Sequence, residues 1–312
     1  MKVAVLFPGQ GSQYVGMGKE ICEAYPEAAA IFNRADEILG FPLSKLCFEG
    51  PEGELTDTVN TQPAVFTTSL ALWEALQNRW SGDEVSFVAG HSLGEYTALV
   101  ASGALSFEDG LRLVRERGRL MKEAGLQNPG GMVAVIGLDP KVLEEICQLV
   151  AERTGKCIRI ANYNSPQQFV IAGHKEALEE AATLAKEKGA RRVIPLAVAG
   201  AFHTELMNSA REGMRKALSS VRFRPPKVPL IANTTAKPVT EPEEIRDELL
   251  RQLESPVLWV DSVNLMAREG VDTFIEVGPK KVLTGLVKRT CRGVKLVGIE
   301  NPRELEEFVN SL

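Results

Sequence analysis

The sequence predicts an α/β protein whose main sheet is mostly parallel. Short apolar runs alternate with helical segments along the chain, and this alternation is typical of a parallel sheet covered by helices. A glycine-rich turn at 90–94 follows one of the apolar runs and precedes a helix. Between about residues 127 and 197 the order of the elements changes, which indicates a smaller unit inserted into the larger one.

The elements of the first part follow from apolar periodicity and from helix-end residues. We expect strands KVAVLF and VSFVAG (85–90), and helices from Pro26 to Leu39, from Thr61 to Trp80, from about Leu93 and after Ser106. Gly40 ends the first of these helices, and Ser106 with Asp109 forms a capping box at the start of the last. The helix from Thr61 is apolar on nearly all sides, so we expect it to be buried.

The middle of the chain has the order strand, helix, strand, strand, helix, strand. After a breaker at 128–131 the segments are MVAVIGL, PKVLEEICQLVAER, CIRIANY, QFVIAG, KEALEEAATLAKEKG and ARRVIPLAV. This βαββαβ order is typical of a ferredoxin-like unit. We therefore expect a large catalytic domain at 1–126 and 198–312 and an inserted ferredoxin-like domain at 127–197. The large domain resumes with a helix after His203, strands VPLIAN and TFIEVG, and helices between about 241 and 269.

The composition disfavours several classes of protein. The chain has 312 residues, 44% of them hydrophobic, which is enough for one large core with a satellite. A net charge of -5 disfavours nucleic acid and anionic membranes as partners, and no apolar run is long enough to span a bilayer. The N-terminal apolar run is too short for a signal peptide. Five cysteines without CxxC spacing indicate reduced thiols in a cytoplasmic protein, not a zinc site or a disulfide frame.

The turn Gly90-His91-Ser92-Leu93-Gly94 matches the GxSxG pattern of a nucleophile elbow, and it has the strand before it and the helix after it that the pattern requires. The turn strains the backbone at the serine, and the glycines remove side chains that would clash. The helix N-terminus adds unpaired N–H groups that favour an oxyanion. We interpret Ser92 as a nucleophile, although a connection that merely needs glycines has the same pattern.

A serine nucleophile needs a base, and the chain has three histidines. His91 is adjacent to Ser92, and neighbouring side chains diverge at a tight turn, so we interpret it as a structural or pocket residue. His174 starts a helix of the inserted unit, where a capping role suffices. His203 lies where the large unit resumes, and by elimination it is the best candidate for the base. No acidic third member is evident.

A second glycine-rich turn, Phe7–Gln13, follows the first strand. A phosphate cradle is one interpretation, but Tyr14 stands where a dinucleotide fingerprint needs glycine, and no lysine follows at Walker spacing. We expect the turn instead to bring a backbone N–H to the site, as a second oxyanion donor opposite that of Leu93.

Arg117 lies in the apolar stripe of the predicted helix after Ser106. A 3.6-residue period places Leu113, Val114, Leu120, Met121 and Ala124 on its side, and Arg112, Arg115 and Arg119 on a solvated face. One interpretation is a guanidinium that pairs with a buried carboxylate or reaches solvent over a packed stem. The other is a bidentate contact with a substrate carboxylate in the Ser92 cleft.

Arg117 and a set of segments together resemble the malonyl-CoA:acyl-carrier-protein transacylases of fatty acid synthesis. The segments are FPGQGSQ (7–13), GHSLGEY (90–96), NYNSPQQFVIAGH (162–174), FHTELM (202–207), RQLESPV (251–257) and EVGPKKVLTGL (276–286). They span nearly the whole chain in the family's order. The resemblance implies an α/β-hydrolase-like large domain with a ferredoxin-like insertion.

The resemblance also implies a role for each site residue. Ser92 would carry the malonyl ester, and His203 would act as general base and then as general acid. The backbone carbonyl of Gln252 would orient His203, which accounts for the missing acid, and Arg117 would hold the malonyl carboxylate. Two backbone N–H groups would form the oxyanion hole, those of Gln10 and Leu93.

The substrates and the partner follow from the same resemblance. Malonyl-CoA would donate the group, CoA would leave, and an acidic acyl carrier protein would accept it, with no permanently bound cofactor and no metal. The acyl pocket would include Phe202, Met121 and His91, with Phe202 narrowing the pocket against an α-methyl group. Because the chain is net negative, an acidic carrier needs a local basic patch; the candidates are Lys186, Lys188, Arg191, Arg192, Lys280, Lys281, Lys288 and Arg289. We expect a monomer.

One position departs from the family pattern, because the family usually has EVGPGK and Lys280 replaces the last glycine. Two other functions stay open. A serine hydrolase, either an esterase or a patatin-like lipase, also uses GxSxG, but it needs no arginine beneath its nucleophile and usually shows an acid partner. A catalytically silent acyl-binding or scaffold subunit would not need both Ser92 and His203.

Overall fold

The computed structural model describes residues 1–312 and contains two sheets. The larger sheet has the strand order β10-β9-β1-β2-β7-β8. Its strands are β1 (Val3–Phe7), β2 (Val85–Gly90), β7 (Leu230–Ile231), β8 (Pro238–Val239), β9 (Thr273–Val277) and β10 (Lys295–Ile299). All neighbours are parallel except β7 and β8. The prediction of an α/β fold with a mostly parallel sheet is therefore confirmed.

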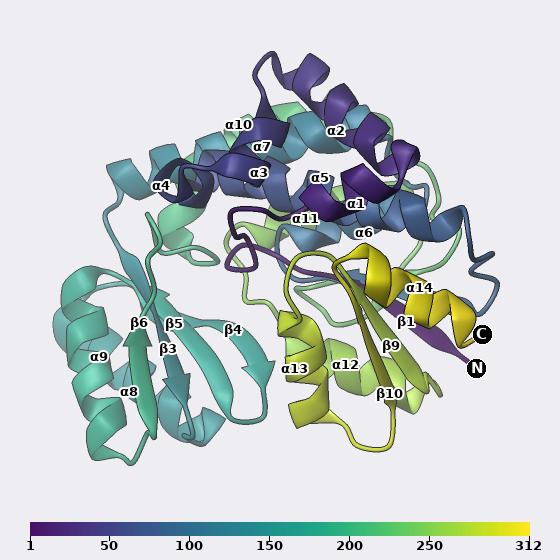
Figure 1. Ribbon diagram of the computed structural model, residues 1–312. Coiled ribbons are helices and arrows are strands. Elements are labelled where there is room, and N and C mark those ends of the chain that lie inside the picture. The colour runs from purple at the N-terminus through teal and green to yellow at the C-terminus, as the bar shows by residue number, and fades with distance from the viewer.

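Helices cover both faces of this sheet (Figure 1). Along β1, Val3, Val5 and Phe7 point into one core cluster, and Ala4 and Leu6 point into another, because side chains alternate along a strand. The second cluster lies under α12 (Trp259–Arg268) and α13 (Val282–Thr290). The first lies under α1 (Lys19–Ala24), α2 (Pro26–Leu39), α3 (Leu43–Glu49), α4 (Glu52–Thr56), α5 (Thr58–Gln77), α6 (Gly94–Ala101), α7 (Phe107–Gln127), α10 (Asn208–Ser219), α11 (Pro242–Gln252) and α14 (Pro302–Asn310).

The smaller sheet is antiparallel and has the order β4-β5-β3-β6. It consists of β3 (Gly131–Ile136), β4 (Ile158–Ser165), β5 (Gln168–Gly173) and β6 (Arg192–Pro195), with helices α8 (Pro140–Thr154) and α9 (Lys175–Glu187). Val133, Val135 and Ile171 pack against these helices. Met132 and Ala134, on the opposite face, belong to the core of the larger unit. The small sheet therefore has apolar contacts on both faces, and Figure 1 shows it beside the main body.

The predicted bounds are confirmed for the helix from Pro26 to Leu39 and for the strand at 85–90. The long apolar helix was placed three residues too late, because α5 runs from Thr58 to Gln77. Its start is set by Asp57, whose side chain accepts the Val59 N–H at 3.1 Å. The predicted strand VPLIAN is reduced to two paired residues, β7.

Two side-chain predictions are wrong. His174 is the N-cap residue of α9, but its side chain makes no capping hydrogen bond; instead its Nδ1 accepts the backbone N–H of Cys157, just before β4, at 3.0 Å. Arg115 is not on a solvated face but half-buried, since α7 packs closely against the first turn of α5. Its Nη1 donates to the Val59 carbonyl at 2.8 Å. No helix combines the length and the apolar character needed to cross a bilayer.

Candidate active site

Ser92 lies at the turn between β2 and α6, with a backbone φ of 53°. A Cβ at Gly90 would lie 1.9 Å from the carbonyl carbon of Gly94, and a Cβ at Gly94 would lie 2.1 Å from the Phe7 oxygen. Only glycine fits at either position. A left-handed serine costs free energy and persists where surrounding contacts enforce it. The tight turn places Ser92 in the wall of a cavity of about 100 Å³.

The backbone of Ser92 is held by two neutral amide side chains. The Ser92 N–H donates to Asn233 Oδ1 at 2.8 Å, and Asn233 Nδ2 donates to the Gly90 carbonyl at 2.8 Å. Gln252 Nε2 donates to the Ser92 carbonyl at 3.0 Å. Sequence reasoning missed Asn233. Its signal was its position as the last residue of the predicted strand VPLIAN in the same parallel sheet, where polar residues gather at the carboxyl edge.

His203 and Ser92 are within hydrogen-bond distance, with 2.8 Å between Nε2 and the serine Oγ. On the other side of the ring, 2.7 Å separates Nδ1 from the backbone oxygen of Gln252. A carbonyl can only accept, so Nδ1 carries the proton and Nε2 is free to accept one from Ser92. Burial, and secondly the charge of Arg117, lowers the pKa of His203 to about 3, which keeps the ring neutral. The arrangement is that of a nucleophile and a base oriented by a carbonyl instead of a carboxylate.

Arg117 lies beneath Ser92 and is 1% exposed. Its Nη2 donates to Ser92 Oγ at 3.0 Å and to Gln252 Oε1 at 2.8 Å, and its Nη1 donates to Gln62 Oε1 at 2.8 Å. The guanidinium also lies 5.5 Å from the centre of the Tyr96 ring. Its Nε has no partner in the chain. Every acceptor is a neutral oxygen.

Arg117 takes part in none of the ion pairs of the chain. Glu95 is fully buried nearby but forms no ion pair with Arg117; burial and then the Glu248 carboxylate raise its pKa, whereas N–H donors from Asn233 and Gln252 and the charge of Arg117 oppose this rise. The interpretation of Arg117 as a buried ion pair or a solvent-reaching side chain is therefore wrong. Sequence reasoning missed Gln62 and Glu95, because a glutamine in an apolar helix and an acid after a glycine have no distinctive pattern.

The backbone N–H groups of Gln10 and Leu93 have no hydrogen-bond acceptor within the chain. Both residues line the Ser92 cavity. The Gln10 loop lies against the elbow: a Cβ at Gly9 would lie 2.4 Å from the His91 carbonyl oxygen, and the His91 N–H donates to the Phe7 carbonyl at 3.1 Å. Two free donors from separate segments thus border the space in front of Ser92, which is the arrangement that an oxyanion hole needs.

The three residues expected in the acyl pocket, His91, Met121 and Phe202, all line the same cavity as Ser92. The remaining wall is largely apolar and includes Met132, Leu196 and Val198. The Nε2 of His91 lies 2.7 Å from Asn164 Oδ1, and burial lowers the pKa of His91. His91 does not contact the Ser92 hydroxyl, which agrees with its interpretation as a pocket residue.

The basic residues proposed for docking do not form one cluster. Arg191, Arg192 and Arg289 line a separate cavity of about 400 Å³ with Gln167 and Gln168. Lys281 is paired with Glu304, so part of its charge is neutralised. Lys186 and Lys188 are exposed at the end of α9. The docking role of these residues stays a prediction. No group of three or more His, Cys, Asp or Glu side chains is arranged to hold a metal ion.

Comparison with known proteins places this geometry in a family. Residues 5–307 match the acyl transferase domain family. The chain belongs to this family of acyl transferases. It is 47% identical over 311 residues to the malonyl CoA-acyl carrier protein transacylase of Bacillus subtilis, and the match covers 100% of this chain and 97% of that protein.

Solved structures of other acyl transferases have the same fold. An acyl carrier protein S-malonyltransferase from Vibrio cholerae matches with a TM-score of 0.94 and 41% identity, over 99% of this chain and 100% of that chain. A type II PKS acyl-carrier protein in complex with its malonyl-transacylase matches with a TM-score of 0.96 and 39% identity, over 100% of both chains. The mixed α/β architecture with a largely parallel sheet is therefore shared with structures of the family.

In this acyl transferase Lys280 occupies the position where the pattern EVGPGK has glycine, and its φ is 60°. Glycine adopts this left-handed conformation readily, whereas lysine adopts it with some strain. The lysine Nζ donates to the Gly11 carbonyl at 3.4 Å. Lys280 thus has a left-handed backbone, and its side chain contacts the Gly11 loop.

Proposed function

We propose that this acyl transferase moves the malonyl group from malonyl-CoA to the phosphopantetheine thiol of an acyl carrier protein. The observation that carries the proposal is Arg117, a buried guanidinium without a carboxylate partner, 3.0 Å from the nucleophilic oxygen. A buried charge without a counterion is costly, so a substrate that brings a carboxylate is favoured over one that does not. The malonyl group has its carboxylate at the end opposite the thioester. The names of the relatives support the same substrate.

In the first half-reaction His203 Nε2 takes the hydroxyl proton of Ser92, and the serine Oγ bonds to the thioester carbonyl carbon. The oxyanion formed there accepts the N–H groups of Gln10 and Leu93, each typically worth about 2.7–4 kcal/mol. The carbon–sulfur bond then breaks, and the sulfur of CoA leaves with the proton from His203. The product is a malonyl-Ser92 ester.

The second half-reaction runs over the same atoms in reverse. The carrier thiol gives its proton to His203, and its sulfur bonds to the ester carbonyl carbon. The bond to Ser92 Oγ breaks, and the serine regains its proton from His203. The Gln252 carbonyl, 2.7 Å from Nδ1, holds the ring in one tautomer throughout both steps. Water is an unwanted third acceptor, and a carboxylate clamp on Arg117 fixes the acyl group for attack by the thiol.

The choice of acyl group follows from the same pocket. A charge-assisted hydrogen bond contributes about 1.5–3 kcal/mol, so one to Arg117 would separate malonyl from acetyl by roughly tenfold or more. Phe202 is 6% exposed and lines the cavity, so it narrows the space against an α-methyl branch. We therefore infer that malonyl is preferred over both acetyl and methylmalonyl.

We further infer that the chain is divided into an α/β-hydrolase-like domain at 1–126 and 198–312 and a ferredoxin-like insertion at 127–197. The order β4-β5-β3-β6, with two helices on one face, supports the insertion. The acidic carrier would dock over the cavity lined by Arg191, Arg192 and Arg289, because those guanidiniums complement acidic side chains.

One assay tests the function. The protein is incubated with malonyl-CoA and the holo form of a carrier protein, and both CoA release and malonyl-carrier formation are followed. We expect both. Release of CoA without malonyl-carrier indicates a serine hydrolase, and neither product indicates an acyl-binding subunit. Malonyl transfer at the same rate as acetyl transfer would contradict the role of Arg117.

A further inference from the structure

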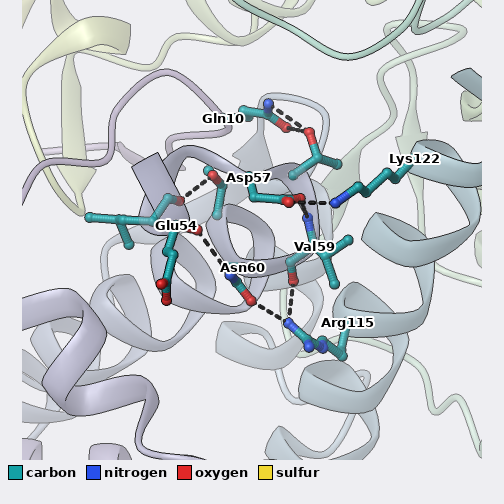
Figure 2. Close-up of polar contacts among 10 residues, drawn as sticks. Gln10, Glu54, Asp57, Val59, Asn60, Arg115 and Lys122 are labelled. Carbon is teal, nitrogen blue, oxygen red and sulfur yellow. Dashed lines mark hydrogen bonds and ion pairs between the residues drawn. The ribbon is translucent and has the colours of Figure 1, made fainter. Parts of the chain in front are cut away.

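Figure 2 shows the side chain of Gln10 turned toward the first residues of α5, beside Asp57 and Val59. Its Nε2 donates to the Thr58 hydroxyl at 2.9 Å, and the Thr58 hydroxyl lies 3.1 Å from its Oε1. Thr58 is 3% exposed, so little water competes for this contact. Gln10 therefore has its backbone N–H at the reaction cavity and its side chain fixed on a buried hydroxyl.

Thr58 is itself held firmly because it is the first residue of α5. The side chain of Asp57, directly before it, caps the helix and forms an ion pair with Lys122, with 2.5 Å between Oδ2 and Nζ (Figure 2). Burial alone would raise the pKa of Asp57, but the Lys122 ammonium and the Val59 N–H together lower it. The capping carboxylate is thus ionised, and it ties the start of α5 to α7.

Helix α7 holds the same turn at two further points. A Cβ at Gly118 would lie 2.8 Å from the Thr58 carbonyl oxygen, so glycine allows the two helices to touch at Thr58. Arg115 Nη1 donates to the Val59 carbonyl at 2.8 Å and to Asn60 Oδ1 at 2.6 Å. Arg115, Gly118 and Lys122 share one face of α7 by their spacing. Thr58 is therefore positioned by the helix that also carries Arg117.

From these contacts we propose that Thr58 is a positioning residue that sets the Gln10 backbone N–H in the oxyanion hole. Before Gln10, the Phe7 carbonyl accepts the His91 N–H of the elbow at 3.1 Å and Gly9 lies close to the same residue; at Gln10 the side chain is bound to Thr58, so the donor lies between two points of contact. Through α5 and α7 the oxyanion donor and Arg117 share one rigid frame. The inference rests on the proposed function for the role of Gln10, and it adds Thr58 to the residues on which the chemistry depends.

The test compares three buried substitutions on α5. Thr58→Val removes the hydroxyl at nearly constant volume, Thr58→Ser keeps it, and Thr68→Val is the control. Thr68 is also buried on α5, but its hydroxyl donates only to the Ala64 carbonyl of the same helix at 2.8 Å. The probes are p-nitrophenyl acetate, which acylates a nucleophilic serine without any malonyl group, and malonyl-CoA with holo-carrier.

Removal of an oxyanion donor costs about 10²–10³ in rate, and a displaced donor retains part of its effect. We therefore expect Thr58→Val to lower the acylation rate by about tenfold with both probes, with KM for malonyl-CoA changed by less than about twofold. Thr58→Ser should keep most of the wild-type rate, and Thr68→Val should keep all of it. A Thr58→Val rate equal to that of Thr68→Val, after comparison of their melting temperatures, would overturn the proposal.

A further variant removes the other partner of the hydrogen bond, the amide of Gln10. Gln10→Met keeps the backbone N–H and removes the amide, so it should lower the rate as Thr58→Val does. The double variant should be no slower than either single variant, because both remove one interaction. Additive losses would show that the two side chains act independently and would overturn the proposal. If wild type reacts with p-nitrophenyl acetate but makes no malonyl-carrier, the proposed function fails while this inference is still decided by the ester.

Discussion

The two faces of α7 use arginine for opposite purposes. Arg119, on the exposed face, is paired with Glu116 at 2.6 Å and with Glu123 at 2.5 Å. Arg117, two residues earlier on the buried face, donates its hydrogen bonds to one hydroxyl and two amide oxygens, with no carboxylate among the acceptors. The exposed arginine is compensated by carboxylates of its own helix, whereas the buried one keeps its full charge.

The difference shows how an amide can hold an arginine without neutralising it. Gln62 and Gln252 accept N–H groups of Arg117 and so fix its orientation, but they carry no charge. A carboxylate in either place would form a buried ion pair and weaken the attraction for a substrate carboxylate. Surface pairs such as those of Arg119 contribute only about 0–1 kcal/mol, because solvent screens them. We therefore interpret the buried face of α7 as a preformed anion site.

The largest effect should come from substitution of Ser92, the proposed nucleophile, whose hydroxyl accepts a hydrogen bond from Arg117. Ser92→Ala removes the only oxygen that carries the acyl group in the proposed mechanism, so transfer should fall to the background rate. Mass spectrometry of the protein after incubation with malonyl-CoA checks this, and wild type should gain one malonyl group. A malonyl adduct that persists in Ser92→Ala would disprove the assignment.

Arg117→Ala should affect malonyl transfer much more than acetyl transfer. Loss of one or two charge-assisted hydrogen bonds of about 1.5–3 kcal/mol each predicts a fall in malonyl transfer of tenfold or more. Acetyl transfer should be nearly unchanged, because acetyl has no carboxylate. Rates of Ser92 acylation by malonyl-CoA and acetyl-CoA measure both.

The matched control for this prediction is Arg119→Ala on the exposed face. It should leave both acylation rates unchanged and shift the free energy of unfolding by less than about 1 kcal/mol. Equal losses of malonyl and acetyl transfer in Arg117→Ala would mean that Arg117 has a structural role only.

Gln62→Glu should give Arg117 a carboxylate partner, as Arg119 already has on the exposed face. The new carboxylate would lie at the present amide position, 2.8 Å from Arg117 Nη1, with almost no change of shape. We expect a severalfold rise in KM for malonyl-CoA and little change for acetyl-CoA, because the guanidinium would already be paired. Gln62→Met, which adds no charge, is the control, and an equal effect of both variants would contradict the argument.

The smallest expected effect is on the pH dependence of kcat/KM, and its direction is defined. Burial, then Arg117, lowers the pKa of His203 to about 3, so the free base is present at neutral and mildly acidic pH. The acid limb of kcat/KM should therefore lie well below about pH 6.5, the ordinary histidine value. Arg117→Ala removes the nearby positive charge, so its acid limb should move to higher pH, as profiles with acetyl-CoA would show. A shift to lower pH would contradict this origin.

The free energy of unfolding should also decrease as the pH is lowered. The unfolded histidine titrates near about pH 6.5 and therefore binds more protons than the folded one between that pH and about 3. The contribution of neutral His203 to stability is present above pH 6.5 and is lost as the pH falls through this range. Urea unfolding at a series of pH values measures it.

Local pattern determined a large part of the fold and the central site residues. The strand at 85–90 and the helix from Pro26 to Leu39 end where the sequence indicates, because apolar alternation and the helix-stop glycine at position 40 act over a few residues. Ser92 was identifiable from its glycines, which the close approach of Phe7 and Gly94 requires. Arg117 was identifiable because a charge in an apolar stripe breaks a local rule.

The contacts of these residues could be known only from the tertiary structure. Asn233 and Gln62 reach Ser92 and Arg117 from distant segments, and a neutral amide in a strand end or a helix has no pattern that predicts its partner. Without the family resemblance, the carbonyl of Gln252 could not be identified as the group that orients His203, since every residue has a carbonyl. Arg115 was misplaced because periodicity describes one helix, whereas its burial depends on how α5 packs against it. Local sequence patterns therefore identify the residues with unusual chemistry, whereas the contacts that position those residues depend on packing between segments far apart in the chain.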